Sequence, residues 1–206
     1  MSWRIIVISS TSKLDLKLGY LVVRNEKITK VHLSEIHTLI IESTAVSLTA
    51  ALLNEMIKRK IKIIFCDEKR NPNSELLPYY GSHDTSSKIK SQIKWKKDYK
   101  GELWQEIIRE KIRNQSKNLK RFKCKNFELL DSYIPQVEIN DISNREGHAA
   151  KVYFNSLFGT EFSRMDISIN HGLNYGYSLI LSSFNKEIVS NGYLTTLGIF
   201  HDNIFN

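Results

Sequence analysis

Short apolar runs that alternate with polar residues dominate the first eighty positions of the chain. Side chains along a strand point to its two faces in turn, so such runs are typical of strands with one buried face. We predict five strands, at residues 4–8, 20–24, 28–32, 38–42 and 62–66. One stretch differs, because Leu48, Leu52, Met56 and Ile57 recur at helical spacing and Ser47 can cap a helix. The pattern predicts a β-rich domain over residues 1–80, with one helix at residues 47–60 packed on its sheet.

The apolar spacing changes beyond a region of broken pattern at residues 70–87, which contains Pro72, Pro78 and Gly81. Proline and glycine interrupt regular structure, so this region suits a link between domains. Apolar residues then recur with the period of a helix, which predicts helices at residues 86–98, 101–125, 143–158 and 169–190. The expected fold class is α+β, with the β-rich domain followed by an all-helical domain over residues 81–206.

Charge changes this picture because it is concentrated in one stretch. The whole chain carries +8 with a pI near 9.4. Residues 88–125 hold fourteen Lys or Arg against four acidic residues, a local excess of ten positive charges. Such an excess favours a polyanionic partner such as nucleic acid. A solvated helix face with Glu–Lys pairs at helical spacing explains the same composition, and both interpretations stay open.

Composition also narrows the cellular setting. The N-terminal MSWRIIVISS lacks the layout of a signal peptide, and no stretch approaches the roughly 20 apolar residues of a membrane span. Cys66 and Cys124 lie far apart without a nearby cysteine partner, which favours reduced thiols. We expect a cytoplasmic protein that does not enter a membrane.

Glu146 is the first residue to which chemistry can be assigned. It opens the amphipathic stretch SNREGHAAKVYFNSLFG and shares a helix face with Ala150, Tyr153 and Leu157. A carboxylate on an apolar face needs a cation or hydrogen-bond donors, because burying it unpaired is costly. Ser143 and Glu146 also match a capping box, in which Glu146 only bonds the first helical turn. The local sequence leaves both roles open.

The stretch from Ile169 to Gly192 and the C-terminal residues hold weaker candidates. One helical stripe contains Asn170, Leu173, Tyr177, Leu181, Phe184 and Ile188, and we expect most of it, apart from Asn170 and Tyr177, to be core. Asn170, Tyr175 and Tyr177 are polar enough to contact a phosphate. His201 follows an apolar run, where a lone histidine is normally a structural residue.

Six stretches in series resemble the CRISPR-associated spacer-acquisition integrase family of type II systems. They are WRIIVISSTSKLDLK, HLSEIHTLIIES, IKIIFCDEKRNP, YYGSHDTS, SNREGHAAKVYFNSLFG and INHGLNYGYSLIL, and they occur in the family's order along the whole chain. Six matches in order are more specific than any single motif. The resemblance implies a small β domain followed by a helical domain.

The resemblance also implies a divalent metal, Mg²⁺ or Mn²⁺, held by a glutamate, a histidine and a later acidic residue. Glu146 matches the glutamate and His201 matches the histidine. The third ligand has no counterpart, since Asp202 does not match that position and the chain ends at Asn206. We therefore expect residues 1–206 to bind DNA but to integrate it poorly.

The implied activity is transesterification that joins the 3′-hydroxyl ends of a short double-stranded spacer to the repeat array. The implied assembly is a homodimer formed through the β domain, bridged by a small companion protein of the adaptation machinery. The expected DNA contacts come from basic residues and three polar ones: Lys88, Arg109, Arg113, Lys117, Arg145, Lys151, Arg164, Asn170, Tyr175 and Tyr177. Two alternatives remain, a non-catalytic basic scaffold that binds nucleic acid and a general nuclease.

Overall fold

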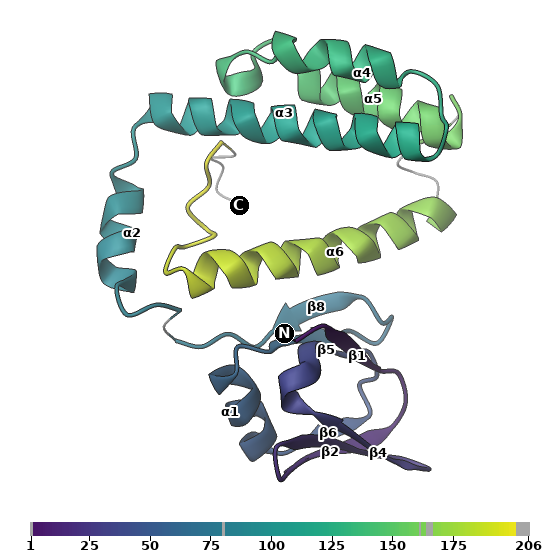
Figure 1. The fold of residues 1–206 in the computed structure, drawn as a ribbon, viewed down its shortest axis with the longest axis vertical. Helices are drawn as coiled ribbons and strands as arrows, with labels where there is room; N and C mark the ends of the chain where they lie inside the picture. Colours follow the sequence, from purple (N-terminus) through teal and green to yellow (C-terminus); the bar gives the residue numbers. More distant parts are fainter. Residues whose placement is uncertain (1, 80, 161, 164–166, 201–206) are drawn as a thin grey trace. The chain divides into compact units, whose positions relative to one another are not determined.

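The structure is a computed structural model that describes residues 2–79, 81–160, 162–163 and 167–200. The chain divides into two compact units (Figure 1). The first contains residues 1–85 and 171–193, and the second contains residues 86–170 and 194–206. Residues 171–193 thus group with the β-rich unit, whereas the predicted division placed them with the helices. The described residues form an α+β protein, as predicted.

The first unit is built on two four-stranded sheets. Sheet 1 has the order β1-β5-β7-β8, with bounds Arg4–Ile8, Ile36–Ile41, Lys62–Cys66 and Pro72–Glu75. Sheet 2 has the order β4-β3-β2-β6, with bounds Ile28–His32, Tyr20–Arg24, Ser12–Lys17 and Val46–Leu48. Strands β1, β5 and β7 are parallel, and β8 runs antiparallel to β7. In sheet 2, β4, β3 and β2 are antiparallel while β6 runs parallel to β2.

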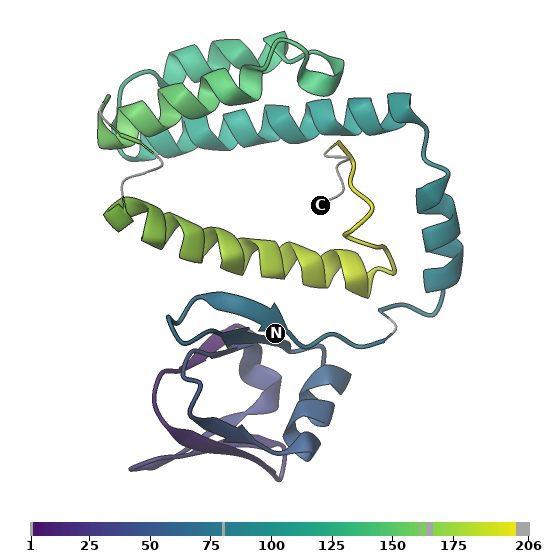
Figure 2. The ribbon, with the colours of Figure 1, turned by 180° about the vertical axis from the view of Figure 1, so that it is seen from behind.

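The core of this unit follows from strand alternation. Leu14 of β2, Leu21 of β3, Leu39 of β5 and Ile63 of β7 are fully buried in one cluster. Helix α1 (Ala50–Lys58) contacts β2 and adds Leu52 and Met56 to this core. Figure 2 shows this helix beside the strands from the opposite side. Apolar burial of this kind contributes about 25 cal/mol per Å² and holds the unit together.

The other face of sheet 1 is covered by α6 (Ile167–Ser190). Leu179 of α6 packs against Ile40, Ile64 and Cys66. Beside this contact, Glu75 accepts hydrogen bonds from Ser182 and Asn185 of α6 and forms an ion pair with Lys62. Helix α6 is therefore fixed to sheet 1 by polar contacts as well as apolar ones.

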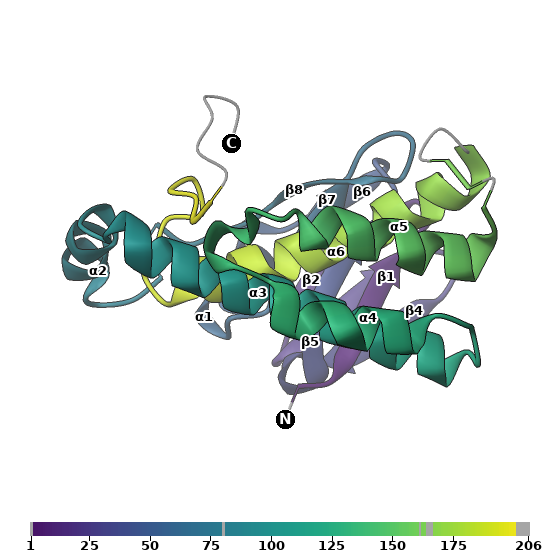
Figure 3. The ribbon, with the colours of Figure 1, turned by 90° about the horizontal axis from the view of Figure 1, so that it is seen from above.

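The second unit is a helical assembly. Its elements are α2 (Thr85–Ile93), α3 (Lys97–Arg121), α4 (Phe127–Tyr133) and α5 (Arg145–Phe158), with the 3₁₀ turns η2 (Ile134–Gln136) and η3 (Ile139–Asp141). Helices α3, α4 and α5 contact one another in pairs, and Figure 3 shows them from above. Ile108, Ile112 and Leu119 of α3 form its core with Leu130 of α4 and Ala149 of α5. No helix in the described ranges is long and apolar enough to cross a membrane.

Several elements differ from the sequence prediction. Strands β2, β6 and β8 and helix α4 are additional, and the helix predicted at residues 47–60 begins only at Ala50. Thr49, not Ser47, caps it by accepting the amide of Leu52 at 3.3 Å. Residues 46–48 instead form β6 and pair with β2. This pairing gives hydrogen-bond partners to backbone groups that would have none in the first turn of a helix.

The apolar stripe of α6 is also placed differently from expectation. Leu181, Phe184 and Ile188 are 71%, 64% and 39% exposed, so the prediction that most of this stripe is core is wrong. The helix turns its opposite side, with Leu179, Ser182 and Asn185, to sheet 1. Hydrogen bonds from Ser182 and Asn185 to the Glu75 carboxylate, together with the packing of Leu179, hold the helix in this orientation.

Candidate metal and nucleic-acid site

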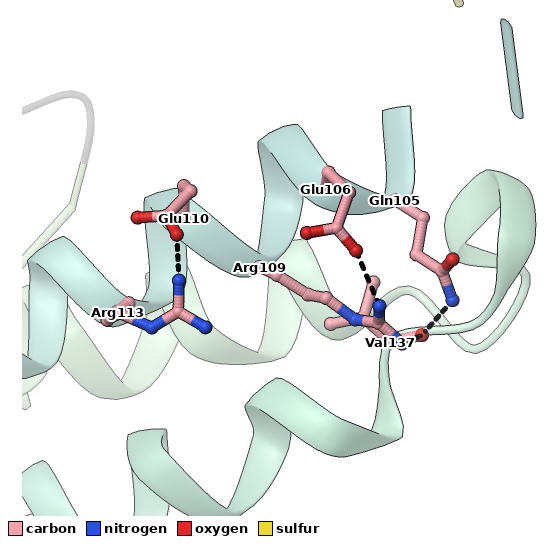
Figure 4. A network of polar contacts seen from close by, with 6 residues as sticks. All are labelled: Gln105, Glu106, Arg109, Glu110, Arg113 and Val137. Carbon is pink, nitrogen blue, oxygen red and sulfur yellow. Dashed lines mark hydrogen bonds and ion pairs between the residues drawn. The ribbon is translucent and has the colours of Figure 1, made fainter. Parts of the chain in front are cut away.

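The basic stretch is carried mainly by α3, and several of its cations are already paired. Arg109 Nη1 lies 2.6 Å from Glu106 Oε1, and Arg113 pairs with Glu110 in the same way one turn later. Arg109 Nη2 also donates to the carbonyl of Val137 at 3.3 Å, beside Gln105, which donates to the same oxygen at 2.6 Å (Figure 4). These contacts fix Arg109 against the loop after α4, so its guanidinium contributes to packing.

Other predicted DNA contacts lie on the surface of the same unit. Lys117 of α3 and Lys151 of α5 are exposed, and Lys88 of α2 is half-buried. Arg145, at the start of α5, stacks over the Tyr133 ring with its guanidinium carbon 5.3 Å from the ring centroid. Its Nε is buried and has no hydrogen-bond partner within the described part of the chain. Arg145 is therefore held by an aromatic ring and retains unused donor capacity.

Glu146 sits on the first turn of α5 with a half-exposed carboxylate. Its Oε1 lies 2.5 Å from Nζ of Lys111, which reaches across from α3. The exposed fractions of the two side chains are 30% and 48%. The carboxylate thus faces a cation supplied by the neighbouring helix, as the apolar-face position of Glu146 predicted.

The capping box predicted for this helix is not formed. Asn144 is the capping residue and accepts the amide of Gly147 at 3.2 Å, while Ser143 Oγ is buried without a partner among the described residues. Asp141 adds a second cap, since its two carboxylate oxygens accept the amides of Arg145 at 2.8 Å and Glu146 at 3.0 Å. The side chain of Glu146 is consequently free of a capping role.

The α6 candidates fall into different units. Asn170 belongs to the second unit and donates to the carbonyl of Ser163 at 3.1 Å. Tyr175 and Tyr177 belong to the first unit. Burial raises the pKa of the Tyr175 hydroxyl, and the nearby Cys66 and Glu42 act in the same direction. Tyr175 is therefore a neutral, half-buried group near sheet 1, and Tyr177 is exposed.

Two candidates, His201 and Arg164, lie outside the described residues. Within the described ranges, no group of three His, Cys, Asp or Glu side chains is arranged to hold a metal ion. The geometry of Glu146 with His201 therefore stays a prediction.

Two contacts made to Glu146 were missed from the sequence. Lys111 was counted in the basic stretch but not paired with Glu146, and no local pattern links residues 35 positions apart. Asp141 was overlooked, although an aspartate a few residues before a helix start is a recognisable capping signal. Lys111 contacts the side chain of Glu146, and Asp141 accepts its backbone amide.

Comparison with known proteins gives a match to one protein family. The model of the family described as CRISPR associated protein Cas1 matches residues 5–204. A CRISPR-associated endonuclease Cas1 from Neisseria meningitidis serogroup C (strain 8013) is 32% identical over 212 residues, covering 100% of this chain and 69% of the relative. A second, CRISPR-associated endonuclease Cas1 1 from Francisella tularensis subsp. novicida (strain U112), is 28% identical over 211 residues, covering 91% and 66%. The chain thus spans about two thirds of the length of these relatives.

Solved structures share the fold. A CAS1 protein from Thermotoga maritima superposes with a TM-score of 0.76 at 16% identity, covering 98% of this chain and 70% of that one. A casposase bound to its integration product gives 0.74 at 21% identity, covering 98% and 65%. A Cas6-RT-Cas1–Cas2 complex gives 0.66 at 17% identity, covering 97% and 25%. At these identities the likeness concerns the fold alone.

Proposed function

Because the chain belongs to the family described as CRISPR associated protein Cas1, we propose that it is a metal-dependent DNA integrase of CRISPR adaptation. It joins the 3′-hydroxyl ends of a short spacer duplex to the repeat array by transesterification. The observation that carries the proposal is the half-exposed carboxylate of Glu146, held at the start of α5 beside a basic helix. The endonuclease names of two curated relatives support the same class of chemistry.

Glu146 and His201 are the proposed ligands of a divalent metal ion, Mg²⁺ or Mn²⁺. The donor set fits, because a carboxylate oxygen and an imidazole nitrogen suit a hard or borderline cation. Lys111 supports the fit, since its ammonium lies 2.5 Å from the Glu146 carboxylate and so occupies a position open to cations. Bound there, a metal ion would neutralise charge on the phosphodiester under attack.

The chain's own residues bind and orient the DNA in this proposal. Lys117 and Lys151 are exposed and can neutralise phosphates without sequence preference. Arg145 adjoins Glu146 in the chain and is pre-positioned by its stacking on Tyr133. Lys88, Arg113, Arg164 and Asn170 complete the proposed contacts in the second unit, and Tyr175 and Tyr177 are the proposed contacts in the first.

The proposed assembly is a homodimer formed through the first unit and joined by a small companion protein. One solved structure with this fold is a Cas6-RT-Cas1–Cas2 complex, which supports the proposal of a partner for this chain. The proposed site of action is the cytoplasm, where the repeat array is found.

The test is a strand-joining assay with the full-length gene product, a labelled spacer duplex, a plasmid that carries the repeat array, and Mn²⁺. We expect Glu146→Gln and His201→Ala to lower joining by about a hundredfold or more, while duplex affinity changes less than about threefold. The control is Glu128→Gln, since Glu128 is an exposed first-turn glutamate of α4. Full joining by Glu146→Gln would refute the proposal and favour a DNA-binding scaffold, and cleavage without joining by the unmodified protein would favour a general nuclease.

A further inference from the structure

A pocket lies at one end of sheet 2, in the first unit. It has a volume of about 520 Å³ and is lined by residues from the starts of β2 and β6 and the end of β3. The lining consists of Thr11, Ser12, Lys13, Arg24, Asn25, Thr44, Ala45, Val46 and Ser47. We name this feature the β2–β6 pocket. Glu146 belongs to the other unit, and none of the lining residues is among the proposed metal ligands or DNA contacts.

The strand register places two cations next to each other in the lining. Lys13 of β2 is paired directly with Arg24 of β3, and on its other side with Ser47 of β6. Partners in neighbouring strands point to the same face, with Cβ atoms about 4.5–5.5 Å apart. Like charges at directly opposite positions oppose strand pairing. Asp15 offsets part of this repulsion through its ion pair with Arg24, and an anion between Lys13 and Arg24 would offset the rest.

Arg24 is fixed in place but keeps most of its donors. Its Nε donates to Oδ2 of Asp15 at 2.7 Å. A guanidinium has five N–H donors, and the four on its terminal nitrogens lie beyond that contact. The ion pair therefore orients the guanidinium in advance, which lowers the entropy lost when an anion binds.

Uncharged donors complete the lining. Asn25 accepts the amide of Lys27 through Oδ1 at 3.0 Å, which leaves the NH₂ group of the same side chain as a donor. Thr11, Thr44 and Ser47 add hydroxyl groups. The nine lining residues include no carboxylate and no aromatic ring. Such a lining suits an oxyanion with several acceptor oxygens and offers no surface for stacking a base.

From this arrangement we propose that the β2–β6 pocket binds a phosphate group through Lys13, Arg24 and the surrounding hydroxyl and amide donors. The phosphate is carried either by a free anion or by a nucleic-acid backbone, and the same donors recognise both.

The test is calorimetric titration of the full chain with inorganic phosphate at constant ionic strength. We expect saturable binding that Lys13→Met weakens about tenfold or more, since a charge-assisted hydrogen bond is lost. Lys17→Met is the matched control, because Lys17 is exposed on the same strand and lies outside the lining. It should change the affinity by less than about twofold. Absence of saturable binding, or equal losses in the two variants, would overturn the proposal.

A second arm identifies the source of the phosphate. If the ligand is a nucleic-acid phosphodiester, Lys13→Met reduces the slope of log affinity for a short duplex against log salt by about one, and Lys17→Met does not. If the ligand is a free anion, duplex binding by Lys13→Met equals that of the unmodified chain while phosphate binding is lost. Glu146→Gln separates this inference from the proposed function. The proposed function predicts that this variant loses strand joining, whereas the inference predicts that its phosphate binding stays intact.

Discussion

Lys111 of α3 and Glu146 of α5 form an ion pair between two helices. Their ion pair is half-exposed, so its contribution to folding stability is small, within about 1 kcal/mol. The position of the ion pair matters more, because the Lys111 ammonium contacts the same carboxylate that would bind the proposed metal ion. The proposed function therefore implies that Lys111 and a divalent cation compete for Glu146.

Lys111→Met tests this competition. We expect Mn²⁺ to bind about three to ten times more tightly, because a competing positive charge of this kind costs roughly 1 kcal/mol. Electron paramagnetic resonance of free and bound Mn²⁺ measures the affinity. Lys117→Met, an exposed lysine of the same helix, should leave it unchanged. Weaker or unaltered Mn²⁺ binding by Lys111→Met would rule the competition out.

Lys62 shows how burial controls a charge in the first unit. The residue is 2% exposed on β7, beside Glu75. Contact with the Glu75 carboxylate favours the ammonium, whereas burial favours the neutral amine. Burial prevails and, with Lys186 acting in the same direction against Glu187, lowers the pKa of Lys62 to about 8.

The pH dependence of stability follows from that pKa. Between about pH 8 and 10.5 the unfolded chain holds a proton on Lys62 that the folded protein has released. The contribution of Lys62 to the unfolding free energy therefore rises with pH in this window, on the order of 1 to 2 kcal/mol after allowance for Glu75. Urea unfolding of the unmodified chain and of Lys62→Met across this window measures it. A constant difference between the two proteins would contradict the assignment.

At the scale of elements, the start of α5 depends on Asp141. This residue is 8% exposed and accepts two backbone amides of the first helical turn, those of Arg145 and Glu146. A carboxylate at a helix N-terminus is stabilised by the helix dipole as well as by these bonds. Asp141 therefore fixes the turn that presents Glu146.

Asp141→Ala should destabilise the protein by about 1 to 2 kcal/mol, the usual cost of losing a capping side chain. Urea unfolding measures this loss, and hydrogen exchange at the amides of Arg145 and Glu146 should become faster. Asp131→Ala is the control, because Asp131 pairs with Lys120 at 2.8 Å through a half-exposed side chain and is not the capping residue of its helix. Equal losses in the two variants would show that Asp141 has no special capping role.

Helix α6 illustrates the limit of periodicity at this scale. The predicted apolar stripe lies on this helix, but most of it is exposed, and the side with Leu179, Ser182 and Asn185 faces sheet 1. Short elements were missed for a related reason. Strand β8 has four residues and α4 has seven, too few for a period to stand out from chance.

At the scale of the whole molecule, the distribution of charge is the basis of the proposed DNA binding. The excess of ten positive charges over residues 88–125 is partly offset within α3 by the Glu106–Arg109 and Glu110–Arg113 pairs. The exposed lysines of α3 and α5 remain as the main phosphate contacts in the proposal. These pairs support the interpretation of a solvated helix face for Arg109 and Arg113, and the interpretation as a nucleic-acid-binding stretch stays a prediction.

Duplex affinity should fall steeply with salt, with a slope of log affinity against log salt of about four to six in magnitude. Combined Lys117→Met and Lys151→Met should reduce that magnitude by about two. Fluorescence anisotropy at several salt concentrations measures both. The control combines Lys27→Met with Lys58→Met, two exposed lysines of the first unit. A flat salt response, or an equal effect of the control, would show that DNA binds elsewhere.

The sequence by itself determined the local features of this protein. Alternation located β1, β3, β4 and β7, the helical period located α3, α5 and α6, and the residue order identified the family. These features depend on neighbours along the chain, which a sequence displays directly. Glu146 and the basic stretch were found in the same way.

Only the tertiary structure decided which distant residues meet. It paired Lys111 with Glu146, joined Lys62 and Glu75 to α6, and set Lys13 between Arg24 and Ser47. Strand register and helix orientation select these partners, and both are fixed by packing over the whole unit. A local pattern restricts the face on which a side chain lies, but the free energy of the complete fold selects the group that it contacts.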